Sequence, residues 1–562
     1  MQKKKVVLSA IFLMSFLFAV SIAYAAEPGQ VIVNSEDWKD VYSTMLYGSL
    51  SGRSVNFLVS NKHATLILEA IPQNTHLWAI SSKKVPFVAG YKAIMESKGY
   101  SAEEFTYDNV NLEIAKLLDV QNFIVMDDSY GYNAISAAPY AVVTNSYVLF
   151  SDRANIGEVA RFLEGRQVKK MLIYGHVDRE VKDALSTYNP EIINKEGDRF
   201  LNNIEIVKRY KQIKGANQVI LTNGEFIEKE LMSGAEPVVF IGTNNVPNVI
   251  RDYIKGSDIQ VGVLIGNELV GTATFIRRQL GISVFVKFAQ GARAQKGAIS
   301  QVEALDMFYL PVYTLNLEVV SLRYNQATKQ LEVTLRNPQD QAVYFIGTYT
   351  LTDSAGVKQT AGDIGANFID GNEIKTIAYD VEQMAEGKIS ADLFVIYGES
   401  AGSLEKEIRK TMEIETVEIR DNCNIEVKGI SFNKRSKYFY ASIENTGDAD
   451  CYLDIEIPDV IVAGEKQTFS MDGVEFLGSK NKKDFKIKAE LTEEDFADNE
   501  NVKVKVYYGE RKDSLVKLFE GIFALTIKST DYLFYSLLVV IIILIILILW
   551  KRRKEKEKNR AA

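Results

Sequence analysis

The sequence predicts a multidomain chain of 562 residues, with three tandem α/β modules built on parallel sheets, two β-sandwiches and one C-terminal transmembrane helix. Three observations predict this order. A set of three short apolar strands occurs three times at offsets of roughly 92 residues, which suits a small duplicated domain. A different pair of strands occurs twice further along the chain, and a long uncharged segment lies near the C-terminus.

Each α/β module is expected to alternate apolar strands with amphipathic helices. The strands are 30–34, 55–60 and 77–81, then 122–127, 147–151 and 171–175, then 218–223, 238–242 and 263–267. Helical spacing of apolar residues marks 136–142, 155–163 and 246–254. Continuous apolar strands between such helices are typical of Rossmann-like parallel sheets that are covered on both faces. The predicted modules span 27–117, 118–213 and 214–300.

The second module resembles the bacterial cell wall-binding repeat of type 2, a family found on clostridial surface-layer-associated proteins. The stretch 133–141 looks like the family's helix motif, with Asn133 where the family has an acid and with Pro139 near its end. The stretch 171–176 is similar to the strand motif, and Gly197-Asp198-Arg199-Phe200 is similar to the motif that closes the repeat. The resemblance implies three modules packed around a pseudo-threefold axis, which hold a protein in the cell envelope.

The closing motif has two interpretations. Asp198 precedes a helix and can accept hydrogen bonds from its first backbone N–H groups, and Arg199 can pair with a carboxylate of the neighbouring unit. Arg199 could instead bind an acidic sugar. Capping and pairing between units suffice to explain the spacing.

Polar side chains follow the predicted strands. Asp127 and Asp128 end one strand of the second module, and Asp152 follows the next. Ligands bind at such carboxyl ends in parallel sheets, so a carbohydrate or metal site is conceivable there, although helix caps and turns make strand ends polar in any α/β protein. A glycan hydrolase could pair Asp127 or Asp128 with Asp152.

The sequence lacks the motifs of the common catalytic classes. It contains no phosphate-binding loop with lysine and no His-Glu-x-x-His. Its histidines, His63, His76 and His176, are not spaced for metal binding with a cysteine. We therefore expect no enzyme activity, no cofactor and no metal site.

Alternating apolar and polar residues predict two β-sandwiches, at 312–415 and 416–529. The strands 317–325 and 331–337 correspond to 425–433 and 439–445 at one ungapped offset of roughly 108 residues, the size of one sandwich domain. These domains look like the immunoglobulin-like domains that are common on archaeal and bacterial surface proteins. That resemblance implies spacers rather than ligand sites.

The same offset accounts for both cysteines. Cys423 and Cys451 correspond to Leu315 and Val343 of the first sandwich, so both are expected to face the core of their domain. Two cysteines in an exported domain suggest one disulfide, and two free buried thiols are the alternative.

The two ends of the chain predict export and anchoring. Three lysines, an apolar run and the step Ala23-Tyr24-Ala25 have the layout of a signal peptide over 1–25. Residues 532–550 carry no charge and, as a helix, would span roughly 28 Å, enough to cross a bilayer core; a buried core helix is the alternative. We expect a transmembrane helix over 531–550, the basic tail 551–562 in the cytoplasm and the rest outside the cell.

The part of the chain expected outside the cell is acidic. Removing three N-terminal lysines and the net charge of the basic tail from the total of −8 leaves about −16, which disfavours nucleic acid as a partner. The expected partners are envelope polysaccharide or surface-layer protein, together with the membrane.

The predicted function is noncatalytic attachment at a bacterial or archaeal cell surface. The alternative is a surface receptor or a glycan-active hydrolase that uses the strand-end carboxylates. Polysaccharide binding without turnover favours the first hypothesis. Loss of product release in Asp127→Asn favours the second.

Overall fold

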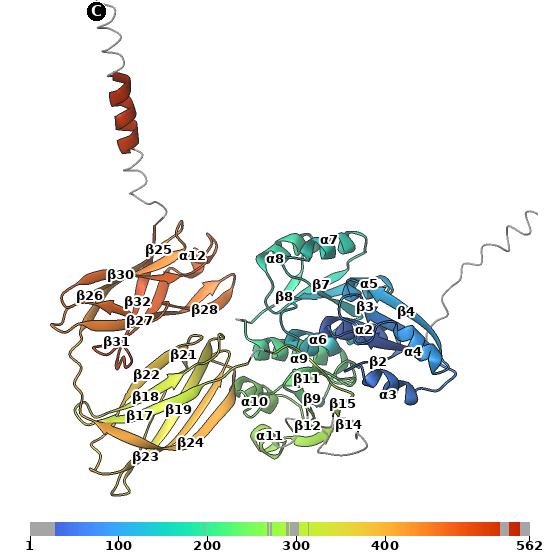
Figure 1. Cartoon of the computed structure of the whole chain (residues 1–562), viewed down its shortest axis with the longest axis horizontal. Coiled ribbons are helices and arrows are strands. Elements are labelled where there is room, and N and C mark those ends of the chain that lie inside the picture. The colour runs from blue at the N-terminus through green and yellow to red at the C-terminus, as the bar shows by residue number, and fades with distance from the viewer. Residues whose placement is uncertain are drawn as a thin grey trace, which may run out of the picture.

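The computed structural model describes residues 29–195, 197–266, 269, 273–287, 291–292, 303–312, 314–528 and 539–550. Figure 1 shows three α/β modules grouped together and two β-domains beside them. The predicted order of domains is therefore correct for the described residues up to 528.

The first module is a parallel sheet in the order β2-β1-β3-β4, joined by helices. Its elements are β1 (Gln30–Asn34), α2 (Trp38–Ser51), β2 (Ser54–Phe57), α3 (His63–Glu69), β3 (His76–Ser82), α4 (Tyr91–Ser97), β4 (Ser101–Tyr107) and α5 (Val110–Lys116). Asp37 begins α2 by accepting a hydrogen bond from the N–H of Lys39, and Gly52 ends it in a left-handed conformation.

The second module repeats this order as β6-β5-β7-β8. Its elements are β5 (Asn122–Met126), α6 (Tyr132–Val143), β6 (Ser146–Phe150), α7 (Ile156–Glu164), β7 (Lys170–Tyr174), α8 (Arg179–Leu185), η1 (Ser186–Tyr188), β8 (Glu191–Ile193) and α9 (Arg199–Lys214).

The third module has the order β11-β9-β12-β13, again parallel. Its elements are β9 (Gln218–Thr222), β11 (Val238–Phe240), α10 (Asn248–Lys255), β12 (Val261–Ile265), α11 (Ala273–Leu280) and β13 (Ser283–Lys287). Two small antiparallel pairs accompany it, β10 (Phe226–Ile227) with β16 (Phe308–Tyr309) and β14 (Gly291–Ala292) with β15 (Glu303–Ala304).

Each module has one strand more than the sequence predicted. The additional strands β4, β8 and β13 lie at the sheet edges. All three are only partly buried, so β4 and β8 do not need a continuous apolar run, whereas β13 contains the apolar run 284–286, which the prediction missed. Glu103 and Glu104 interrupt β4, and β8 is only three residues long.

The three modules share one apolar core. A continuous cluster of buried side chains includes Val31 and Val33 of β1, Phe123 of β5 and Leu221 of β9. Helix α6 packs against both α2 and α9, which brings the modules together. A smaller cluster around Ile32 and Tyr91 lies in the first module alone.

A buried asparagine joins the first module to the second. The side-chain N–H2 of Asn111, on α5, donates to Ser43 Oγ of α2 at 2.8 Å and to the carbonyl of Val148 in β6 at 2.9 Å. Its side-chain oxygen accepts the N–H of Phe150 at 3.4 Å. Asn111 thereby connects a helix of its own module to a strand of the next.

An equivalent asparagine joins the second module to the third. The N–H2 of Asn203, on α9, donates to Ser136 Oγ of α6 at 2.7 Å and to the carbonyl of Val238 in β11 at 2.9 Å. Its oxygen accepts the N–H of Phe240 at 2.9 Å. We call Asn111 and Asn203 the clamp asparagines. They are 92 positions apart, so the duplication preserved this contact.

Each β-domain is one curled sheet. In the first, the order is β20-β19-β23-β24-β17-β18-β22, with β21 beside β19. The strands are β17 (Glu318–Asn325), β18 (Gln330–Arg336), β19 (Val343–Thr352), β20 (Lys358–Gly362), β21 (Asn367–Ile369), β22 (Ile374–Asp380), β23 (Ile389–Gly398) and β24 (Leu404–Val417). The sheet curls along β24, which pairs antiparallel with β23 up to Ile414 and parallel with β17 from Glu415.

The second β-domain repeats the first, in the order β28-β27-β31-β32-β25-β26-β30 with β29 beside β27. Its elements are β25 (Ile425–Asn433), β26 (Tyr438–Asn445), β27 (Cys451–Val462), β28 (Glu465–Ser470), β29 (Glu475–Leu477), β30 (Lys482–Lys488), α12 (Asp495–Asp498), β31 (Asn501–Gly509) and β32 (Lys517–Lys528). The predicted offset holds, since Leu315 and Val343 lie in one core and Cys423 and Cys451 in the other.

Both β-domains contact the second α/β module. Arg199 binds Glu405 of the first β-domain at 2.5 Å, and His176 Nδ1 lies 2.7 Å from Glu465 Oε1 of the second. The hydrogen bond with Glu465 raises the pKa of His176 above its ordinary value. The contact between His176 and Glu465 therefore weakens when the pH rises through this raised pKa and the imidazole loses its charge. Each of the two predicted spacer domains therefore packs directly against the second module.

The predicted chain ends are mostly not described. The signal peptide 1–25, the tail 551–562 and the first part of the predicted spanning helix lie outside the described residues, and 539–550 form a helix. Within the described part of the chain, no helix is both long and apolar enough to span a membrane.

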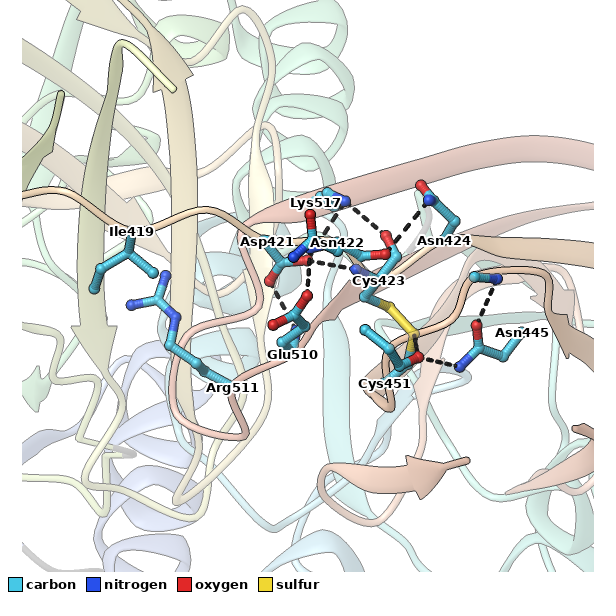
Figure 2. A network of polar contacts seen from close by, with 12 residues as sticks. Ile419, Asp421, Asn422, Cys423, Asn424, Asn445, Cys451, Glu510, Arg511 and Lys517 are labelled. Atoms are coloured by element: carbon cyan, nitrogen blue, oxygen red, sulfur yellow. Dashed lines mark hydrogen bonds and ion pairs between the residues drawn. A yellow bond between two sulfur atoms is a disulfide. The ribbon is translucent and has the colours of Figure 1, made fainter. Parts of the chain in front are cut away.

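The cysteines form the disulfide Cys423–Cys451, with the two Cα atoms 5.4 Å apart. Figure 2 shows polar contacts that surround it. Lys517 Nζ donates to the carbonyl of Cys423 at 2.6 Å, and the N–H of Glu510 donates to Asp421 at 2.7 Å. The disulfide and these contacts fix the first residues of the domain against its later strands.

Asn203→Ala should lower the free energy of unfolding by about 2–4 kcal/mol, because it leaves a buried carbonyl and a buried N–H without their partner. A denaturant titration of the full chain measures this. Gln212→Ala, on the exposed side of the same helix, should change the free energy of unfolding by less than about 0.5 kcal/mol.

The α/β modules should unfold in one transition, and a separate transition for one module would contradict the shared core.

Replacing the disulfide with the first domain's pair, Cys423→Leu with Cys451→Val, should still allow folding. The loss of the loop constraint over 28 residues should cost about 3 kcal/mol in the chain-entropy model. Equilibrium denaturation of both proteins, followed by far-UV circular dichroism, measures this difference in the free energy of unfolding. A double variant that does not fold would show that the two cores are not equivalent at these positions.

Candidate functional site

The strand-end acids of the second module are engaged within the chain. Asp127 accepts the N–H of Ser129 at 2.8 Å, and Asp152 accepts the N–H groups of Ala154 and Asn155 at 2.9 and 2.8 Å. These are turn and helix-start contacts. Asp127 and Asp152 therefore perform the structural role that any α/β strand end requires.

Asp128 has a different partner. Its carboxylate binds Nζ of Lys39, on α2 of the first module, at 2.7 Å. Among the described residues, no group of three or more His, Cys, Asp or Glu side chains could hold a metal ion. The structure thus brings Asp128 to the first module rather than to a shared site with Asp152.

Asp198 caps a helix and also binds the first β-domain. One carboxylate oxygen accepts the N–H groups of Phe200 and Leu201 at 2.8 and 3.0 Å, which fixes the start of α9. The other accepts hydroxyl hydrogens from Ser400 at 2.7 Å and from Ser403. Gly197, with φ of 71°, makes the left-handed turn that leads into this cap.

Arg199 is buried between the second module and the first β-domain. Its guanidinium is 3.0 Å from Glu399 and 2.5 Å from Glu405, and it lies over the ring of Tyr132 with 4.1 Å to the ring centre. Burial raises the pKa of Glu399, and the charge of Arg199 opposes that shift. Both partner carboxylates come from the β-domain. Arg199 therefore forms the predicted ion pair, but with the β-domain and not with a neighbouring α/β unit.

The remaining motif residues support the module internally. Asn133 lies on α6 beside Gly175, and a Cβ atom on Gly175 would come within 2.2 Å of its Nδ2. Pro139 is buried in the middle of α6. We name the contacts of Asp198 and Arg199 with Glu399, Ser400, Ser403 and Glu405 the polar junction.

An open groove of about 730 Å³ lies between the first and second modules. It runs between the end of β4 with α5 on one side and α7 on the other. Its lining includes Tyr107, Asp108, Asn109, Glu113, Lys116, Glu158, Arg161 and Phe162. We call it the module groove.

The chemistry of the module groove suits a neutral, hydroxyl-rich ligand. Tyr107, which is stacked with Phe105, and Phe162, whose ring lies beneath Arg166, supply apolar area to the lining, while amide, carboxylate and cationic groups supply hydrogen-bonding groups. Three acids and two cations nearly balance, so the groove does not favour a strongly anionic polymer.

The sequence did not reveal the groove or the polar junction. The groove residues come from strand β4, which was not predicted, and from two helices in different modules. The partners of Arg199 lie far along the chain, and Glu405 is 206 positions after Arg199. An arginine directly after a capping aspartate was the only available signal.

No family model matches the chain, and no curated protein sequence matches it. Among solved structures, Cwp8 from Clostridium difficile has a TM-score of 0.38 and 16% identity, over 46% of this chain and 48% of that protein. The match thus spans about half of Cwp8. The periplasmic chaperone SfaE has a TM-score of 0.14 and 12% identity, over 38% of this chain and 100% of its own. Scores this low do not establish a shared fold.

Arg199→Met should lower the free energy of unfolding by about 3–5 kcal/mol, because it leaves two buried carboxylates without their cation. The matched control is Arg409→Met. The Arg409 guanidinium pairs with Glu407 on an exposed strand, so its loss should lower the free energy of unfolding by at most about 1 kcal/mol. Thermal and denaturant unfolding measure both. Equal stability of the two variants would contradict a structural role for the polar junction.

Proposed function

We propose that this protein is a membrane-anchored cell-surface protein that binds envelope glycan or surface protein without catalysis, through its α/β modules. In this proposal the apolar segment 532–550 anchors the chain, and the curled β-domains connect the modules to the anchor. The envelope localisation rests on the sequence resemblance of the second module and on the two apolar chain ends.

One observation carries the noncatalytic part of the proposal. The strand-end groups that a hydrolase would direct at a substrate are bound within the chain, Asp127 and Asp152 to turn N–H groups and Asp128 to Lys39. Arg199 is likewise enclosed by its own chain. The module groove, in contrast, is open to solvent, and the ion pairs at its lining, Lys116 with Glu113 and Asp108 with Lys83, are exposed enough to exchange for contacts with a ligand.

The direct test is binding of the full chain to purified envelope polysaccharide of the source cells. The chain should sediment with the polysaccharide and release no soluble product. Product release that disappears in Asp127→Asn would overturn the proposal and support a hydrolase.

The double variant Lys116→Ala with Arg161→Ala should weaken this binding by about 30- to 150-fold, since two hydrogen bonds of about 1–1.5 kcal/mol each are lost. The control, Lys62→Ala with Lys98→Ala, removes the same charge from exposed positions outside the groove and should bind normally. Unchanged melting temperatures show that both variants fold. Equal binding by the two variants would exclude the module groove as the site.

A further inference from the structure

The two β-domains meet at a buried lysine and a buried glutamate. Lys375 lies on β22 of the first β-domain, and its Nζ contacts Oε1 of Glu456 on β27 of the second. Only 4% of the Lys375 side chain and 1% of the Glu456 side chain are exposed. Lys375 Nζ also donates to the carbonyl of Phe368 at 2.7 Å.

The surroundings of this pair are mostly aromatic and acidic. The ring centre of Tyr507 is 4.4 Å from Lys375 Nζ. Asp454 is buried two residues before Glu456 on the same strand, and its Oδ1 has no hydrogen-bond partner among the described residues. A cavity of about 20 Å³ beside Lys375, Asp454 and Tyr507 has room for one water molecule.

A primary amine and a carboxyl group are thus held together away from solvent. Keeping both of them charged there costs desolvation energy that an ion pair recovers only in part. Condensation to an amide removes both charges. We propose that Lys375 and Glu456 form an isopeptide bond between Nζ and Cδ, which covalently joins the two β-domains.

The reaction needs no other reagent. The neutral amine of Lys375 attacks Cδ of the neutral carboxyl group of Glu456, the C–N bond forms and the C–OH bond breaks. One hydrogen from nitrogen joins the departing hydroxyl as water, so no oxidant or reductant takes part. Asp454 is placed to move protons, and the remaining amide N–H keeps the hydrogen bond to Phe368.

Burial favours the neutral forms of Lys375 and of two acids near it, Asp454 and Glu373. Burial lowers the pKa of Lys375 and raises the pKa of Asp454. Burial also raises the pKa of neighbouring Glu373 to about 7. These shifts move the amine and these acids towards their uncharged forms, which is the direction that the condensation requires.

The duplication supplies a matched control. Lys483 of the second β-domain is 108 positions after Lys375 and lies 2.6 Å from Glu475. Its side chain, however, is 46% exposed to solvent. Water stabilises this second pair as ions, so it should not condense.

Mass spectrometry of the reduced, denatured and trypsin-digested full chain tests the proposal. The wild-type chain should yield a branched peptide that joins 359–388 to 438–466, with the summed mass less one water and no cleavage after Lys375. Lys375→Met should lose this species, and Lys483→Met should keep it. The wild-type result is decisive even if a variant fails to fold.

Two outcomes would overturn the proposal. One is recovery of 359–375 and unmodified 438–466 as the main wild-type products, which would show a simple buried ion pair. The other is a branched peptide whose fragment ions place the bond on Asp454, which would refute Glu456 as the partner.

Discussion

The arrangement of the α/β modules depends on the requirement that buried polar groups find hydrogen-bond partners. Asn111 and Asn203 are both buried, and each satisfies its amide with a serine of its own module and with backbone groups of the next. Neither could do so in an isolated module, where these groups would face water or remain unpaired. The clamp asparagines therefore give the shared apolar core a defined geometry, because apolar contacts alone are not directional.

The same requirement connects the modules to the β-domains. Asp198 uses one oxygen to start α9 and the other to bind serines of the first β-domain, and Arg199 places its charge between two carboxylates of that domain. At another interface of the same β-domain, Lys375 meets Glu456 of the second. Buried basic and acidic side chains thus meet at both interfaces of the first β-domain, Arg199 with Glu399 and Glu405 at one and Lys375 with Glu456 at the other.

The polar side chains of this molecule fall into two sets: one is buried at the contacts between domains, and the other lines an open groove. The polar junction resembles a binding site in composition, yet its charged groups are buried and paired within the chain itself. The module groove contains fewer distinctive residues, but it is open, nearly balanced in charge and lined by aromatic and hydrogen-bonding groups. A rigid assembly of modules with an open groove between them is suited to holding an extended ligand, which is the function proposed for this protein.

The sequence alone determined the number and order of the domains, because duplication leaves a constant offset between apolar strands and because buried strands need continuous apolar runs. It also predicted the positions of Cys423 and Cys451, since their counterparts Leu315 and Val343 are apolar. Only the tertiary structure showed the edge strands, the partners of Arg199, the module groove and the Lys375–Glu456 pair. The partly buried strands β4 and β8 carry no full apolar signal. The other features join residues up to about 200 positions apart, whose proximity depends on how separate cores pack rather than on any local pattern.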